Sequence, residues 1–143
     1  MLKIYTSADP STAVSYGGDF GNPIAITFDG VNGGKIERKL YLRNDEITKL
    51  YDTITIQPQD DPESETEITT DVNGYSWKLY VGDQRPLEEQ WDMISPANTI
   101  NLSDLSNTTT YLPFWLRITV PAGAPAVSFR SASLLISCNE ETA

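Results

Sequence analysis

The sequence predicts an all-β protein, an immunoglobulin-like β-sandwich of seven to eight strands with one short helix and an extended N-terminal arm. Three observations predict this fold class. Short stretches of alternating apolar and polar residues recur along the chain, turn-forming residues separate them at roughly regular intervals, and only one stretch is a good helix candidate. With 143 residues, of which 39% are hydrophobic, the chain is long enough to bury a core as one domain.

Residues 1–22 predict an arm, and residues 23–143 predict the sandwich domain. Leu2, Ile4 and Tyr5 favour a short strand, whereas residues 7–22 are polar and rich in turn formers. We expect the arm to lie either along its own sandwich or on a neighbouring subunit, and deletion of residues 1–20 to leave a folded domain.

Alternating stretches predict five strands in the first part of the sandwich domain. Asn73 and Gly74 favour a tight hairpin turn between the last two of them. The five stretches are residues 23–28, 35–43 and 51–57, then a short edge strand at residues 68–72, and a strand at residues 75–81 with an especially clear alternation.

Residues 86–93 are the one good helix candidate. Pro86 suits a helix start, and two glutamates follow in the first turn, where the helix dipole favours negative charge. Because Leu87 and Trp91 are four residues apart, we expect these two side chains to be buried together.

The densest apolar run, residues 111–123, predicts the central strand of the sandwich. Pro113 and Pro121 should mark its ends, because proline cannot donate a hydrogen bond within a sheet. Short strands are also expected at residues 99–102 and 132–138. The core face of the central strand carries Phe114, Leu116, Ile118 and Val120, and the other face carries Trp115, Arg117 and Thr119.

The alternation also predicts which side chains fill the core. In the last strand, Ala132 and Cys138 should point inward together with their apolar neighbours. The predicted core consists of Ile24, Ile26, Phe28, Leu40, Leu42, Ile54, Ile56, Trp77, Leu79, Phe114, Leu116, Ile118, Leu134 and Ile136.

Charge and composition exclude several classes of function. The net charge of −10 argues against binding to nucleic acid and to anionic membranes, because both need basic surfaces. We expect no signal peptide, because residues 1–10 lack a basic start followed by an apolar core. The sequence has no run of about 18 apolar residues, and a single cysteine allows no disulfide within the chain. These features favour a protein assembled in a reducing cytosol.

The chain has no histidine, so Ser-His-Asp and Cys-His catalytic sites and histidine-based zinc sites are excluded. Cys138 is expected to be a buried, inert thiol. We therefore predict no catalytic residue, no cofactor-binding residue and no metal ligand, and we expect that the protein is not an enzyme.

Residues 58–67 form an acidic stretch that is the best metal candidate. Its carboxylates are hard ligands of the kind that calcium prefers, but their spacing matches no defined calcium loop. A solvated acidic loop without a metal requirement is the preferred interpretation. The carboxylates in question belong to Asp60, Asp61, Glu63 and Glu65.

Tyr80 and Trp115 lie opposite the clearest inward faces of their strands. A carbohydrate-binding face would use these two aromatic rings. Alternatively, a subunit interface or the N-terminal arm covers this face.

Three pieces of the chain together carry a family resemblance. They are residues 39–45 (Lys-Leu-Tyr-Leu-Arg-Asn-Asp) with 51–56 (Tyr-Asp-Thr-Ile-Thr-Ile), Trp77-Lys-Leu with the helix at Pro86, and residues 111–121 (Tyr-Leu-Pro-Phe-Trp-Leu-Arg-Ile-Thr-Val-Pro). Residues 23–138 resemble the small immunoglobulin-like virion proteins of tailed bacteriophages, which decorate heads or serve as tail and baseplate accessory modules.

The resemblance implies a non-enzymatic virion structural protein, a capsid decoration or cement protein or a head–tail accessory protein. The implied partners are major capsid or tail proteins, with homo-oligomeric or repeated contacts and neither nucleic acid nor membrane. The implied location is the virion, with assembly in the bacterial host cytoplasm. The alternative is a carbohydrate-binding or adhesin-like module.

Overall fold

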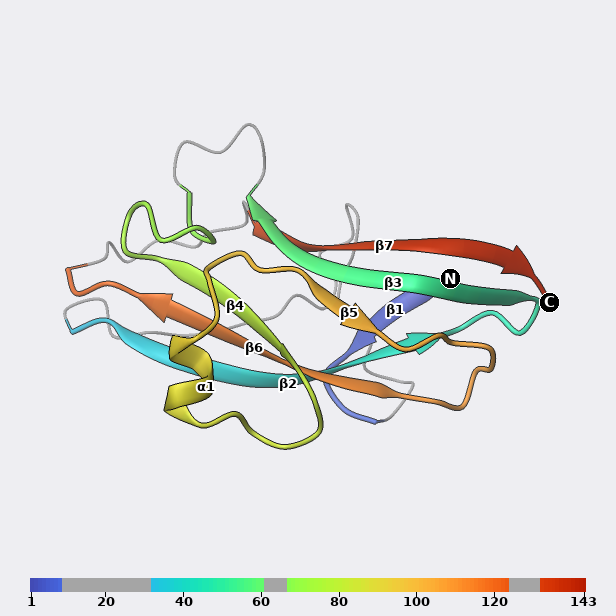
Figure 1. Ribbon diagram of the computed structural model, residues 1–143. Helices are drawn as coiled ribbons and strands as arrows, with labels where there is room; N and C mark the ends of the chain where they lie inside the picture. Colours follow the sequence, from blue (N-terminus) through green and yellow to red (C-terminus); the bar gives the residue numbers. More distant parts are fainter. Residues whose placement is uncertain (9–31, 61–66, 124–131) are drawn as a thin grey trace.

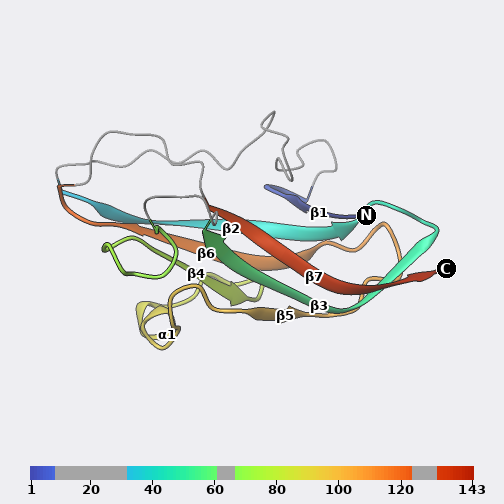
Figure 2. The same cartoon turned by 90° about the horizontal axis from the view of Figure 1, so that it is seen from above.

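The structure, a computed structural model, describes residues 1–8, 32–60, 67–123 and 132–143. In these residues seven strands form two antiparallel sheets that lie one above the other, with a single short helix (Figures 1 and 2). The elements in chain order are β1 (Leu2–Tyr5), β2 (Gly34–Asn44), β3 (Lys49–Asp60), β4 (Ser76–Val81), α1 (Glu88–Asp92), β5 (Ile100–Leu102), β6 (Leu112–Val120) and β7 (Ala132–Thr142).

The order of the strands confirms the predicted fold class. One sheet has the order β1-β2-β6-β4 and the other the order β5-β3-β7. The consecutive strands β2 and β3 lie in opposite sheets, and each pairs with a strand far along the chain, β2 with β6 and β3 with β7. These pairings build a two-sheet antiparallel sandwich, with β5 at the other side of β3.

The central strand is confirmed as β6, which pairs with β2 on one side and β4 on the other. Its alternation places Phe114 and Leu116 in the core with no exposed surface, and Ile118 is 8% exposed. Pro113 does not end the strand as predicted. It is the second residue of β6 and pairs with Tyr41, close to the end of the strand, where few ladder hydrogen bonds are lost.

Most of the predicted core is confirmed. Three side chains of the prediction, Trp77, Leu134 and Ile136, are partly buried and pack against the core cluster. Ile24, Ile26 and Phe28, with their predicted strand, lie outside the described residues. The buried members of the prediction are Leu40, Leu42, Ile54, Ile56, Leu79, Phe114, Leu116 and Ile118.

The start of the predicted arm belongs to the sandwich. β1 pairs with β2 at the edge of the four-stranded sheet, and Leu2, Ile4 and Tyr5 are buried in it. The rest of the predicted arm, from residue 9 to residue 22, lies outside the described residues.

Strand β3 is longer than predicted. It continues through Pro58, which is buried and lies opposite Leu134, and ends at Asp60. A proline is tolerated here because this part of β3 pairs only with β7, so one side of the strand needs no donor. The strand predicted at residues 68–72 is wrong, since this segment makes a single bridge, from Thr70 to Ser76.

The helix prediction is right in place and wrong in detail. α1 covers five residues, and Pro86 lies before its N-cap rather than in its first turn. Leu87 is the N-cap residue with extended backbone, and its side chain is 65% exposed, whereas Trp91 is fully buried. The two side chains are not buried together, because the i to i+4 spacing brings residues together only when both are helical.

Cys138 is exposed, so its prediction as a buried thiol is wrong. It lies on the same face of β7 as Leu134 and Ile136. It is also opposite the position where the register of β3 shifts, between Asp52 and Thr55. In the described part of the chain β7 is the last strand of its sheet, and its inward face is only partly covered there. Alternation gives the face of a residue but not whether the facing sheet reaches that far.

Candidate functional site

A polar recess of about 560 Å³ opens on the face of the four-stranded sheet that points away from the core. Its floor comes from β2 and β6, and its rim comes from the segment that leads into α1 and from α1 itself. The recess is lined by Gly34, Lys35, Glu37, Arg85, Glu88, Trp115 and Arg117.

Arg117 is the centre of this recess, although it points away from the core. Arg117 is nevertheless buried, with only 5% of its surface exposed to solvent. Its Nη2 donates to Glu88 Oε1 at 2.7 Å, and its Nε lies 3.9 Å from Glu37 Oε1, too far for a hydrogen bond. Glu37, the cross-strand partner of Arg117, also accepts a hydrogen bond from Arg85. The charged side chains of the recess are thus largely bound to one another.

Helix α1 explains why Arg117 is buried. Trp91, fully buried, lies beneath the guanidinium, with 5.7 Å between the Arg117 Cζ and the ring centroid. Lys78, on β4, donates to the Trp91 carbonyl at 3.2 Å. In Figure 1 α1 lies beside β4 and β6, on the side away from β3 and β7. A segment of the same chain therefore covers part of the outer face of this sheet.

The structure brings together the two aromatic residues proposed for sugar binding. Tyr80 and Trp115 are cross-strand partners on β4 and β6. Trp115 lines the recess, but Tyr80 packs against Trp91 at 6.2 Å between ring centroids and accepts a hydrogen bond from Gln90 at 3.0 Å. Only Trp115 therefore borders the open recess.

Two ion pairs near the recess shift the pKa of their members. The hydrogen bond from Arg117 lowers the pKa of Glu88, which favours the charged carboxylate. Next to the recess, Lys39 and Asp83 are bonded at 2.5 Å, and this bond raises the pKa of the lysine and lowers that of the aspartate. The recess thus presents one indole ring beside charged side chains that are largely bound to one another.

The acidic stretch is only partly described. Asp60, at the end of β3, accepts hydrogen bonds from the Ile68 amide at 2.8 Å and from Thr69 Oγ1 at 2.7 Å. The Asp60 carboxylate thus fixes the segment at residues 68 and 69 beside the end of β3, and both of its oxygens already accept hydrogen bonds. Asp61, Glu63 and Glu65 lie outside the described residues. Within the described ranges, no group of three or more acidic, cysteine or histidine side chains is placed to hold a metal ion.

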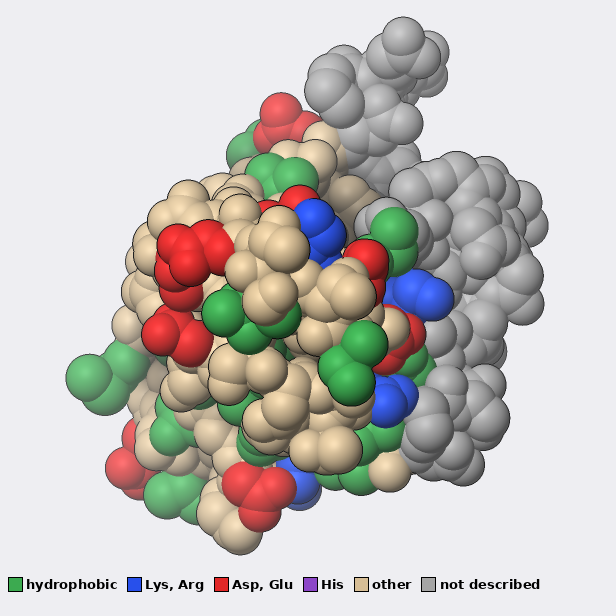
Figure 3. All heavy atoms as spheres, turned by 90° about the vertical axis from the view of Figure 1, so that its right-hand side faces the viewer, with side chains coloured by type: hydrophobic (Ala, Val, Ile, Leu, Met, Phe, Trp, Pro, Cys, Tyr) green, Lys and Arg blue, Asp and Glu red, His purple; other side chains and the backbone are tan. Residues whose placement is uncertain are grey.

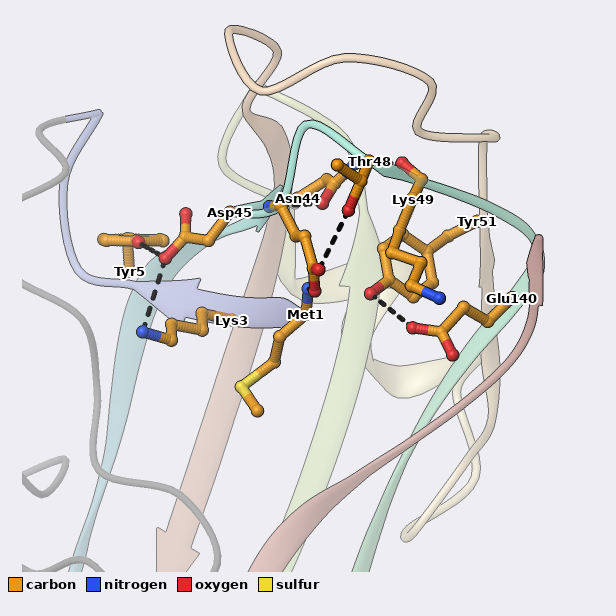
Figure 4. A network of polar contacts seen from close by, with 10 residues as sticks. Met1, Lys3, Tyr5, Asn44, Asp45, Thr48, Lys49, Tyr51 and Glu140 are labelled. Atoms are coloured by element: carbon orange, nitrogen blue, oxygen red, sulfur yellow. Dashed lines mark hydrogen bonds and ion pairs between the residues drawn. The ribbon is translucent and has the colours of Figure 1, made fainter. Parts of the chain in front are cut away.

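A polar network fixes the end of the sandwich where both termini lie (Figure 4). Tyr5 donates to Asp45, which also lies 3.5 Å from Lys3, and Tyr51 donates to Glu140 at 2.9 Å. Figure 3 shows acidic and hydrophobic side chains exposed at this end, and Ile47 at the tip of the turn after β2 is 80% exposed.

The turn between β2 and β3 and helix α1 do not form one surface. The turn lies at the end that carries the termini, whereas α1 lies toward the other end (Figure 1).

Comparisons with family models, with curated proteins and with solved structures gave no match. No helix in the described part of the chain has the length and apolar character needed to cross a membrane.

The sequence did not reveal the recess. Its two key contacts join β6 to β2 and to α1, and neither partner of Arg117 is near it in the chain. The one available signal was an arginine in the middle of the most apolar strand, where a charge needs partners when it is buried.

Proposed function

We propose that this protein is a non-enzymatic structural protein of a bacteriophage virion, a capsid decoration or cement protein or a head–tail accessory protein. It acts through surface contacts with major capsid or tail proteins, and the virion assembles in the bacterial cytoplasm. The resemblance of residues 39–45, 51–56 and 111–121 to such proteins supports the proposal, and so does the sandwich fold.

The observation that carries the proposal is which of the described side chains contact one another and which are exposed. Apolar side chains from both sheets fill the interior, and charged side chains around Arg117 bind one another. What remains for a partner is the outer surface, including the whole length of β7, whose residues are mostly exposed. A protein with these properties is suited to hold other proteins rather than to transform a small molecule.

A binding assay tests this function. Purified protein is mixed with capsids and, separately, with tail subassemblies that lack it, and bound protein is measured after sedimentation. The proposal predicts saturation at a fixed ratio to one of the two structures. An unrelated β-sandwich protein of similar net charge serves as the control. Binding no greater than that of the control to both structures would contradict the proposal.

Carbohydrate binding is a second candidate, favoured by one observation. Trp115 borders a recess that also offers Lys35, Arg85 and Glu37, and an indole ring beside polar groups suits a sugar ring. A glycan array tests it: wild-type protein should bind a defined set of glycans and Trp115→Ala should not. If neither protein binds any glycan, this candidate is excluded and the virion proposal is unaffected.

A further inference from the structure

Among the described residues, one long edge of strand β7 has no strand partner, since all of the pairing given there is with β3. β7 has 11 residues, longer than most strands, and nearly all of its described side chains are exposed. Such an edge presents a row of backbone donors and acceptors to which another strand can be added.

The sequence of β7 does little to prevent such pairing. Proteins protect exposed edges with proline, lysine, bulges or very short strands. β7, with the sequence ASLLISCNEET, contains no proline, lysine or arginine, and the irregularity in its pairing with β3 arises from an extra residue on β3. Leu135 on its outer face is 43% exposed. Its only charges are Glu140 and Glu141, near one end.

We propose that β7 pairs with β7 of a second copy of this chain, antiparallel across a two-fold axis at Ser137, so that the two three-stranded sheets become one. The position of the charges selects this arrangement. Full antiparallel overlap places Glu140 opposite Leu134 and Glu141 opposite Ser133 of the second copy. In-register parallel pairing would instead place each glutamate beside its own counterpart, which is unfavourable.

The pairing also accounts for the exposure of Cys138. This thiol lies on the inward face of β7 but is exposed, and β7 is the last strand of the sheet that the described residues form. In the paired arrangement it lies opposite Ile136 of the second copy and is covered. The two Cys138 residues are then diagonal neighbours, with about 7–8 Å between their backbones.

The inference deepens the proposed function, because a virion protein in many copies gains from contacts with itself. Its test uses the isolated protein and so can fail without the virion function failing. The net charge of −10 opposes association of two copies, and salt screens this repulsion. Association should therefore become stronger as the salt concentration rises.

Sedimentation equilibrium of the wild-type protein and three variants is the experiment. Ser137→Glu and Ser137→Lys each place two like charges directly opposite at the two-fold axis. Each should weaken the dimer, by up to about fivefold in Kd from that contact. A mixture of the two variants places opposite charges there and should restore dimerisation. Ser106→Glu, which adds the same charge at an exposed loop position, controls for net charge.

The single cysteine provides an independent readout. A short bis-maleimide should cross-link the wild-type protein through Cys138, and the double variant Cys138→Ser/Ser106→Cys should give no cross-linked dimer. A wild-type protein that stays monomeric up to millimolar concentration at high salt overturns the proposal. So does a dimer in which the mixed Ser137 variants associate no better than either variant alone.

Discussion

Arg117 on β6 donates a hydrogen bond of 2.7 Å to Glu88 on α1, although the two residues are 29 positions apart in the chain. The arginine is buried between this glutamate, Glu37 and the ring of Trp91. A charge buried in this way needs its partners. The contact therefore fastens α1 and the segment before it to the outer face of the sheet.

Replacement of Arg117 by alanine should lower the free energy of unfolding by about 1–3 kcal/mol, because it removes a hydrogen bond between charged groups and uncovers Trp91. Chemical denaturation measures this loss. Arg38→Ala, at an exposed position on β2, is the matched control and should change stability by no more than about 0.5 kcal/mol. Equal effects of the two replacements would show that Arg117 does not hold the helix.

Leu116→Ala should cost about 2–5 kcal/mol, from lost burial and the cavity left behind, since Leu116 has no exposed surface. Leu87→Ala, at a side chain that is 65% exposed, should have a small effect. Thermal and chemical unfolding of both variants provides the comparison. A loss below 1 kcal/mol for Leu116→Ala would contradict the placement of β6 at the centre of the core, as 1 kcal/mol lies well under the range of about 2–5 for such cavities.

Stability should fall in alkaline solution. Burial, with the hydrogen bond to Asp45 second, raises the pKa of Tyr5 from 10.0 to about 12, and burial also raises the pKa of Tyr51. A raised pKa in the folded state means that the stabilisation is full below pH 10 and is lost as the pH rises toward about 12. Unfolding measured across this range should show the decline, and Tyr5→Phe should reduce its slope. An identical slope for Tyr5→Phe would exclude Tyr5 as a cause.

Deletion of residues 1–5 should destabilise the isolated protein. The sequence alone predicts a dispensable arm of residues 1–22, but Leu2 and Ile4 are 6% and 8% exposed in the edge strand β1. Removing them uncovers the core beside β2. The melting temperature of the truncated protein is the measurement, and an unchanged value would restore the view that the whole arm is separate from the fold.

The protein should not need a metal. A chelator should leave the melting temperature unchanged, because exposed carboxylates bind calcium weakly and Asp60 is already bonded to residues 68 and 69. Differential scanning calorimetry with chelator and with millimolar calcium is the measurement. A clear rise in melting temperature with calcium would mean that residues 58–67 form a binding site.

The fold was predictable because one residue property, apolar alternation, decides which side of a strand faces the core. It placed Phe114 and Leu116 correctly with no knowledge of their neighbours. The same property failed where the outcome depends on how far the opposing sheet extends, as at Cys138, or on which strand edge is unpaired, as at Pro58.

The candidate site could not be predicted in the same way. Trp115 and Tyr80 were assigned to the outer face, but their different exposure to the recess depends on α1, which packs against Tyr80 and not across the recess. Glu37 and Glu88 become partners of Arg117 only once the register of β2 with β6 and the path of residues 82–92 are known. Such contacts are properties of tertiary packing, and the sequence shows only that an arginine in so apolar a strand needs partners, not which residues they are.

The most direct test of the virion function is the protein content of purified particles. The proposed function implies that a phage encodes this chain. Particles of that phage are purified by density gradient, and the chain is quantified by mass spectrometry relative to the major capsid protein. The account predicts that the chain co-purifies with the particles at a constant copy number across independent preparations. Recovery of the chain only in the particle-free fraction of the lysate would contradict it.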